Sequence, residues 1–359
     1  MRRTAVYLAI LGLPAAAADD APPLHMHVFK QKPRPEVVSM AASKETPALH
    51  MTVIRDKHKP PKIVPESASP FLFRFGLNSG YRQDRLRWNI AADPGGEISP
   101  NILSELKWKD VESIRLASDA HLVTPVNIAV QARAAYSWIV DGKNRDSDYS
   151  ENNRNGEYSR SINNADEGHT LDLSGGLGYA FTVLGSRRHP YLRLTPLGGY
   201  AYYEQSLHMT HGRQVIATEG LTPPPGRFPD LDSSYKAKWK GPWLGLRFES
   251  ELGRFGLFGQ AEYHWADYDA KADWNLRNEL RHPVSFRHHA DGWGIDAFWG
   301  GDWQLTDNLA LEVRFDYRTW ETDPGTDKTF FSDGTIIKTR LNEVTWKAFG
   351  ANLGLQMNF

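Results

Sequence analysis

The sequence contains no cysteine, no long apolar run and almost no net charge. Without cysteine, its 359 residues cannot form a disulfide scaffold, a thiolate zinc site or a cysteine nucleophile. Lys and Arg number 42 against 43 Asp and Glu, so no positive field steers nucleic acid, and no nucleic-acid partner is expected. Membrane helices each need about 20 consecutive apolar residues, which excludes a helical bundle. The composition does not exclude a membrane β-barrel, because the strands of such a barrel are apolar only at alternate positions.

The first eighteen residues have the organisation of a secretory signal peptide. Two arginines follow the initial Met, residues 5–14 are apolar, and residues 15–18 are small enough for cleavage after Ala18. The other interpretation is a membrane anchor. We therefore leave residues 1–18 out of the predicted fold and expect export, with which the absence of cysteine is consistent.

Residues 19–69 are rich in Pro, Lys and His and contain a repeat, LHMHV at 24–28 and LHMTV at 49–53. Proline lacks an N–H and fixes φ, so we expect an extended, mostly disordered periplasmic segment. It is interpreted as a linker without ligand, so no metal and no cofactor is predicted. The alternatives are a segment that docks to a periplasmic partner and a Cu(I) site. Its ligands would come from His25, Met26, His27, His50 and Met51.

Residues 70–359 show the period of two that is typical of β-strands. In 351–359 the odd positions are Ala, Leu, Leu, Met and Phe, and the even ones are Asn, Gly, Gln and Asn. Residues 126–137 and 257–265 alternate in the same way, with Arg133 and Glu262 on the polar face. Arg at the bilayer midplane costs roughly 2–4 kcal/mol on the lipid side. The polar face is therefore predicted to line the lumen, and the apolar face to contact lipid.

Turn residues divide this region into ten strands, joined by four short and five long connections. The long polar connections are near 89–101, 142–166, 211–233, 273–284 and 323–340. The predicted fold is all-β: a ten-stranded antiparallel outer-membrane barrel with long extracellular loops and an interior filled by side chains. Trp88, Trp138, Trp265 and Trp320 are predicted to form the interfacial girdles. The strands are expected at 71–88, 102–120, 126–141, 167–183, 190–210, 234–252, 255–273, 284–304, 309–322 and 341–359.

Four segments within 70–359 match, in order, strands of a known family. They are Gly76, Ser79, Gly80 and Arg85 in the first strand, LKWK at 106–109, YKAKWKGPWLGL at 235–246, and 255–306. In these segments the chain resembles omptins, ten-stranded outer-membrane proteases of Gram-negative bacteria. The resemblance implies hydrolysis of peptide bonds by a water held between two pairs of side chains across the groove at the top of the barrel.

The resemblance implies a catalytic site made of Asp146, Asp148, Asp273 and Asn275. The family has Asp-x-Asp on one side of the groove and Asp-x-His on the other, and this sequence has Asn275 in place of the His. Asn can orient a water but cannot accept its proton, so much of a ~10²–10⁴-fold general-base contribution is expected to be lost. Either catalysis has been lost, or the carboxylates serve another chemistry, or another imidazole acts. The candidates are His264, His282, His288 and His289.

Strict alternation conflicts with this site. It places Asp146 on the same face as Tyr136, and Asp273 on the same face as Tyr263, which is the lipid side. A β-bulge or a twist above the membrane must turn both aspartates inward if they are to act together.

The resemblance also implies binding residues. Asp84 and Lys271 align with acidic residues that read a basic substrate residue, and Lys271 reverses the charge. Lys238 aligns with a lipopolysaccharide-binding residue, and Lys240 lies beside it. Contact with outer-membrane lipids and lipopolysaccharide is expected, and lipopolysaccharide is the one factor that activity would require.

Two functions follow from these observations. The first is an omptin-like endopeptidase that acts on exposed polypeptides. The alternative is a catalytically degenerate barrel that serves binding, adhesion or assembly with a surface partner. A lumen crowded with Arg, Glu and Trp argues against a channel.

Overall fold

The computed structural model describes residues 71–186 and 188–359. The predicted signal peptide, the repeat segment and its candidate copper ligands lie outside the described residues. No helix in the described part of the chain is long and apolar enough to cross a bilayer.

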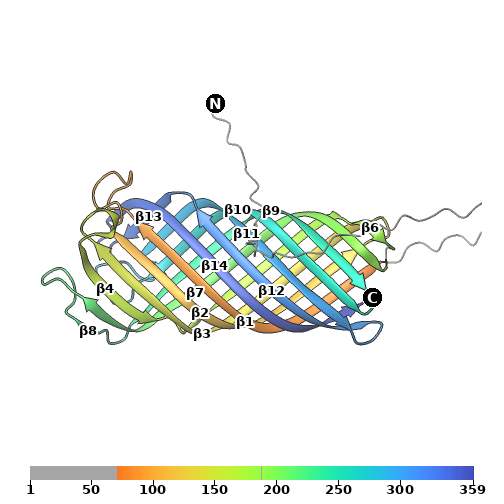
Figure 1. Ribbon diagram of the computed structural model, residues 1–359. Helices are drawn as coiled ribbons and strands as arrows, with labels where there is room; N and C mark the ends of the chain where they lie inside the picture. Colours follow the sequence, from red (N-terminus) through yellow and green to blue (C-terminus); the bar gives the residue numbers. More distant parts are fainter. Residues whose placement is uncertain (1–70, 187) are drawn as a thin grey trace, which may run out of the picture. The chain divides into compact units, whose positions relative to one another are not determined.

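Fourteen antiparallel strands in the described residues close into one ring, because β1 pairs with both β2 and β14 (Figure 1). The described residues also contain one 3₁₀ turn, η1, which spans Asn152–Arg154. The strands are β1 Leu72–Ile90, β2 Ser104–Val123, β3 Ile128–Tyr149, β4 Glu157–Asn164, β5 Gly168–Tyr179, β6 Phe181–Gly185, β7 Pro190–Ile216, β8 Gly226–Arg227, β9 Asp232–Leu252, β10 Phe255–Asp273, β11 Phe286–Gln304, β12 Leu309–Thr322, β13 Gly325–Phe330 and β14 Ile336–Asn358.

These strands occupy the ten predicted positions of the barrel wall. β4, β5 and β6 follow one another beside β7, and β8 and β9 follow one another on its other side. β12 and β13 share the position between β11 and β14. The predicted all-β barrel is therefore confirmed.

Three of the predicted long loops are partly strand, so their prediction as loops is wrong. Within 142–166, β3 continues to Tyr149 and β4 pairs with it; within 211–233, β7 continues to Ile216 and pairs with β8; within 323–340, β13 pairs with β11 and β14. Their polar residues carry no apolar alternation, because both faces of this wall lie beyond the lipid. The wall therefore extends past the membrane, at the end of the barrel where β4, β8 and β13 lie (Figure 1).

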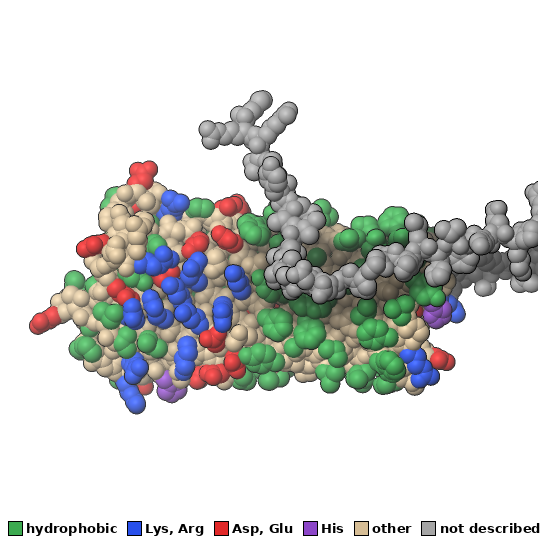
Figure 2. Space-filling model, viewed as in Figure 1, with side chains coloured by type: hydrophobic (Ala, Val, Ile, Leu, Met, Phe, Trp, Pro, Cys, Tyr) green, Lys and Arg blue, Asp and Glu red, His purple; other side chains and the backbone are tan. Residues whose placement is uncertain are grey.

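The outer face of the wall divides into an apolar band and a charged region (Figure 2). Large apolar side chains that are exposed on it include Leu77, Leu246, Trp265, Ile295 and Leu353. A continuous apolar surface of this kind is stable only against lipid. The C-terminus and the short turns lie at the other end of the barrel from β4 and β13, and this is the periplasmic end of such proteins.

The girdle prediction is half right. Trp138 and Trp265 are exposed on the outer face, but Trp88 and Trp320 are buried in the lumen. Trp320 faces the lumen because it packs on Gly294, where a Cβ would lie 2.3 Å from the indole. Only a glycine permits this approach.

Inside the barrel, aromatic rings fill the half away from the periplasmic end. Five of the largest fully buried side chains in the described residues are tryptophans, and their rings contact one another, buried tyrosines or a buried histidine. Side chains therefore fill this half of the lumen, as predicted. These tryptophans are Trp108, Trp239, Trp243, Trp320 and Trp346.

Candidate functional site

A bulge in the β2–β3 ladder turns Asp146 and Asp148 toward the lumen. Below the irregularity the buried positions of β3 are odd, as at Ser137 and Ile139, whereas above it Gly142 and Asn144 are buried, so the inward positions of β3 change from odd to even. Asp146 then lies directly opposite Leu106, which is buried in the lumen. The bulge that the sequence analysis required for this pair is present.

The two carboxylates occupy a half-buried site at the extracellular end. Burial, and next the charge of Asp148, raise the pKa of Asp146 well above its ordinary value, and the charge of Arg277 opposes this rise. Burial also raises the pKa of Asp148, against the opposing hydrogen bonds of the Ser104 and Ser159 hydroxyls. A close pair of carboxyls with raised pKa values holds protons more readily than isolated aspartates do, as acid–base sites require.

The second predicted pair is not turned inward. β10 keeps one register with both β9 and β11 from Phe255 to its end, so no bulge reverses its faces. Asp273 and Lys271 therefore lie on the outer face with Trp265. Asp273 contacts His282, with 2.5 Å between Oδ1 and Nδ1.

Asn275 holds a neighbouring loop. Its Oδ1 accepts hydrogen bonds from the Asp232 backbone N–H and the Ser233 hydroxyl, both at 3.0 Å. Its Nδ2 donates to the Asp230 carbonyl at 2.7 Å. These three hydrogen bonds occupy both polar atoms of the Asn275 side-chain amide and tie it to the start of β9. Asn275 therefore fixes the segment between β8 and β9.

The other histidines lie apart from the carboxylate pair. His264 and His288 are buried in the lumen, and His289 lies on the outer face beside Asp269. Among the described residues, no histidine hydrogen-bonds Asp146 or Asp148. The charged group of the 274–285 loop that acts on them is Arg277, which sequence reasoning missed because no motif marks it.

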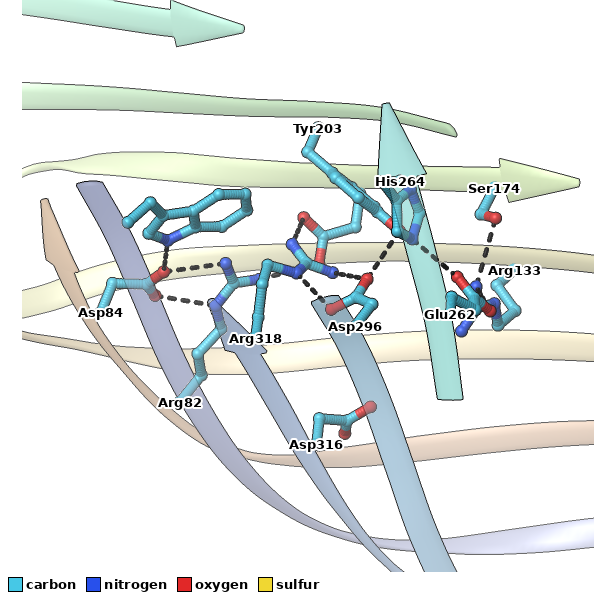
Figure 3. A network of polar contacts seen from close by, with 12 residues as sticks. Arg82, Asp84, Arg133, Ser174, Tyr203, Glu262, His264, Asp296, Asp316 and Arg318 are labelled. Atoms are coloured by element: carbon cyan, nitrogen blue, oxygen red, sulfur yellow. Dashed lines mark hydrogen bonds and ion pairs between the residues drawn. The ribbon is translucent and has the colours of Figure 1, made fainter. Parts of the chain in front are cut away.

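Asp84 belongs to a chain of ion pairs across the lumen (Figure 3). It accepts hydrogen bonds from Arg82 at 2.7 and 2.9 Å and from the Trp346 indole at 2.7 Å. Asp84 is 2% exposed, whereas Lys271 is on the outer face, so the structure does not bring this predicted pair together.

The chain of ion pairs continues through Asp172 to Arg318 and Asp296. Arg82 and Arg318 donate hydrogen bonds to Asp172 at 2.8 and 3.1 Å, respectively. Arg318 also donates two hydrogen bonds to Asp296, at 2.7 and 2.9 Å. Tyr203 donates to Asp296 at 2.8 Å (Figure 3). The buried carboxylates are thus paired, which is the arrangement that makes charge tolerable away from water.

Lys238 and Lys240 lie on the outer face of β9, beyond the apolar band. Lys238 lies 3.7 Å from Glu204, and Lys240 lies 3.1 Å from Asp269 and 3.4 Å from Asp267. Both predicted lipopolysaccharide contacts therefore already have carboxylate partners, and their role stays a prediction.

The closed ring, the apolar band and the filled lumen define an outer-membrane β-barrel, which contacts membrane lipids. The chain belongs to the family described as Pom, Protochlamydia outer membrane protein, whose model matches residues 76–359. A search of curated proteins finds no match to the sequence.

Solved structures of outer-membrane barrels are similar in fold. The outer membrane protease OmpT from Escherichia coli matches with a TM-score of 0.66 and 15% identity, over 82% of this chain and 99% of that chain. OprG from Pseudomonas aeruginosa matches with a TM-score of 0.31 and 11% identity, over 80% of this chain and 95% of that one. The omptin resemblance is therefore confirmed as a likeness of fold, and the outer-membrane location is confirmed.

Proposed function

We propose that this protein is a closed, non-hydrolytic outer-membrane barrel that serves binding or assembly. The observation that carries the proposal is the separation of the predicted catalytic residues. Asp146 and Asp148 face the lumen, whereas Asp273 lies on the outer face and Asn275 holds a loop. A water held between the two pairs would need all four on one groove.

The groups around the carboxylates also favour this proposal. Arg277 is the cation that acts on Asp146 and Asp148, and a guanidinium stays protonated at any physiological pH. It can stabilise an anion but cannot take a proton from water. Among the described residues no imidazole contacts the carboxylate pair, so the pair lacks the histidine base on which the resemblance relies.

We also propose that the barrel does not conduct solutes through its lumen. The lumen contains a cavity of about 50 Å³ between Arg82, Arg133 and Arg318. Aromatic rings and ion pairs surround it, and we expect them to prevent the passage of a solute.

A peptide-library cleavage assay tests the proposal. The full chain, refolded with lipopolysaccharide, is compared with Asp148→Ala and with Lys109→Ala, a control on the outer face. We expect no cleavage above background in any of them. Cleavage by the wild type and by Lys109→Ala that is lost in Asp148→Ala would contradict the proposal.

A second candidate is an endopeptidase whose imidazole comes from His282. The observation in its favour is that His282 lies 2.5 Å from Asp273, the aspartate that the resemblance assigns to orient a histidine. In this case wild-type cleavage is lost in His282→Ala. Equal cleavage by the wild type and His282→Ala would exclude this candidate.

A further inference from the structure

Five cations form one continuous row across five strands of the outer wall. Lys236 on β9 pairs directly with Lys271 on β10, and Lys271 with Arg287 on β11. Arg287 pairs with Lys328 on β13, and Lys328 with Lys338 on β14. We call these five residues the cation row. Like charges placed directly opposite one another destabilise a sheet, so the row has a cost that the fold itself does not require.

Most of the row has no carboxylate partner. Lys236 contacts Glu204 at 2.9 Å. Among the described residues, no acidic side chain lies within ion-pair distance of Lys271, Arg287, Lys328 or Lys338. The neighbouring Lys238 and Lys240 differ, because Glu204, Asp267 and Asp269 pair with them. The row is therefore the part of this surface where positive charge stays uncompensated.

The row lines a shallow hollow of about 700 Å³ on the outer wall. All five cations of the row contribute to its lining, together with Lys238, Lys240 and a single carboxylate, Asp269. Neighbouring strands are about 4.8 Å apart, so five strands give a row about 19 Å long. A single phosphate cannot span this length, whereas a headgroup with several phosphates can.

The height of the cation row above the membrane further limits the class of ligand that can reach it. On β10 the outward face changes from Trp265, which lies in the apolar band, to Lys271 six residues later. Six residues rise about 20 Å along a strand, or about 15 Å along the membrane normal for a strand tilted by about 40°. Ordinary phospholipid headgroups reach only about 5–8 Å beyond the hydrocarbon. A ligand at this height must project further than they do.

We propose that the cation row binds the phosphorylated sugars of an outer-leaflet glycolipid. Arg and Lys are the side chains that bind phosphate oxygens, and such side chains gather on the outer face beyond the apolar band (Figure 2). This site lies on the outer wall, so it is independent of whether the extracellular end hydrolyses peptides. It also lies beside, and not on, the pair that the omptin resemblance implies.

Binding is measured with the full chain folded in zwitterionic detergent. The probes are lipopolysaccharide with phosphorylated core sugars, the same lipopolysaccharide after dephosphorylation, phosphatidylglycerol vesicles and inorganic phosphate. The main variant carries Lys271→Gln, Arg287→Gln, Lys328→Gln and Lys338→Gln. The matched control carries Lys109→Gln and Lys143→Gln, a directly opposed pair of exposed lysines on β2 and β3.

We expect the wild type to prefer phosphorylated lipopolysaccharide to every other probe. Each neutralised cation is expected to lower affinity about fivefold, so the four independent losses multiply to about 600-fold in the fourfold variant, and the control stays within about twofold. Unchanged binding by the fourfold variant, or equal binding of the dephosphorylated lipid, would overturn the proposal. Equal binding of phosphatidylglycerol or of inorganic phosphate would also overturn it, because ordinary headgroups or free anions would then suffice.

Stability gives a second readout that needs no binding assay. Without glycolipid, the fourfold variant is expected to melt at the wild-type temperature or above, because like-charge repulsion has been removed. With glycolipid, only the wild type and the control gain stability. If the fourfold variant does not fold, Lys328→Gln with Lys338→Gln on the β13–β14 hairpin gives the same comparison. A wild type that gains no stability from the glycolipid would overturn the proposal.

Discussion

Opposite charges are paired in the lumen of this barrel, whereas like charges lie beside one another on its outer wall. In the lumen, Asp296 is bound by Arg318 and Tyr203, and Asp172 by two arginines. On the outer wall, the cation row sets five positive charges side by side. Burial forces pairing, because an unpaired charge away from water is costly. Where water screens charges, like charges can gather, so their placement there reports on a partner of the protein more than on its fold.

The strongest test of this comparison is Arg318→Ala. Arg318 binds two carboxylates and stacks on Tyr203, with 3.8 Å from its guanidinium carbon to the ring centroid. Its removal leaves Asp172 and Asp296 short of positive charge in the lumen, which costs about 3–5 kcal/mol of unfolding free energy. Urea unfolding in detergent, followed by tryptophan fluorescence, measures the loss.

The matched control on the outer wall is Lys328→Ala. Its exposed side chain has no acidic partner among the described residues, so the change stays within about 0.5 kcal/mol. If both variants lose the same stability, the distinction between lumen and wall is wrong.

Tyr203→Phe tests one hydrogen bond of the same network. The variant keeps the ring, which packs edge to face on Trp320, and removes only the hydroxyl that donates to Asp296 at 2.8 Å. Hydrogen bonds to charged groups contribute about 1.5–3 kcal/mol, so a loss in this range is expected in the same urea assay. Combined with Arg318→Ala, the two losses are expected not to add, because both residues share Asp296. Simple additivity would show that the network does not act as a unit.

The sequence predicts the wall well and the site poorly, for one physical reason. Alternation depends on lipid on one side and lumen on the other, so the spanning strands are found to within a few residues, and β12 at 309–322 is found without error. Beyond the lipid, that constraint disappears, and β4 and β13 were predicted as loops. In the sequence Trp320 fits an interfacial girdle, because only the structure shows that Gly294 leaves space for the indole inside the lumen.

The same reason explains why the sequence does not predict the geometry of the candidate site. The β2–β3 bulge, which turns Asp146 inward, leaves no mark in a sequence of polar residues. Neither does the loop that brings Arg277 near the carboxylates, nor the cross-strand register that aligns the cation row. The cation row is a property of the pairing of five strands, and each strand contains only one of its residues.

Asp146→Asn tests the intermediate case, a carboxylate at the border between lumen and water. Burial and the charge of Asp148 raise the pKa of Asp146, so the folded protein holds this proton more tightly than the unfolded chain does. Stability from the protonated group is present at low pH and is lost as pH rises from the unfolded value of about 3.8 through the raised value. The asparagine side chain stays neutral at every pH, so the variant is expected to melt above the wild type at pH 7.5 and at the same temperature at pH 3. A constant difference across this range would show that the Asp146 carboxyl is not responsible.

The smallest effect is expected for Arg85→Ala, which breaks an ion pair that is exposed to water. Arg85 donates to Asp110 at 2.9 Å, and more than half of each side chain is exposed. Water and salt screen such pairs, so the loss is expected to be below about 1 kcal/mol, and to shrink further in 0.5 M NaCl. The same urea assay that records the loss for Arg318→Ala is the measurement. A loss near that of Arg318→Ala would mean that burial does not set the value of a charge in this barrel, because the two pairs have similar distances and differ mainly in their contact with water.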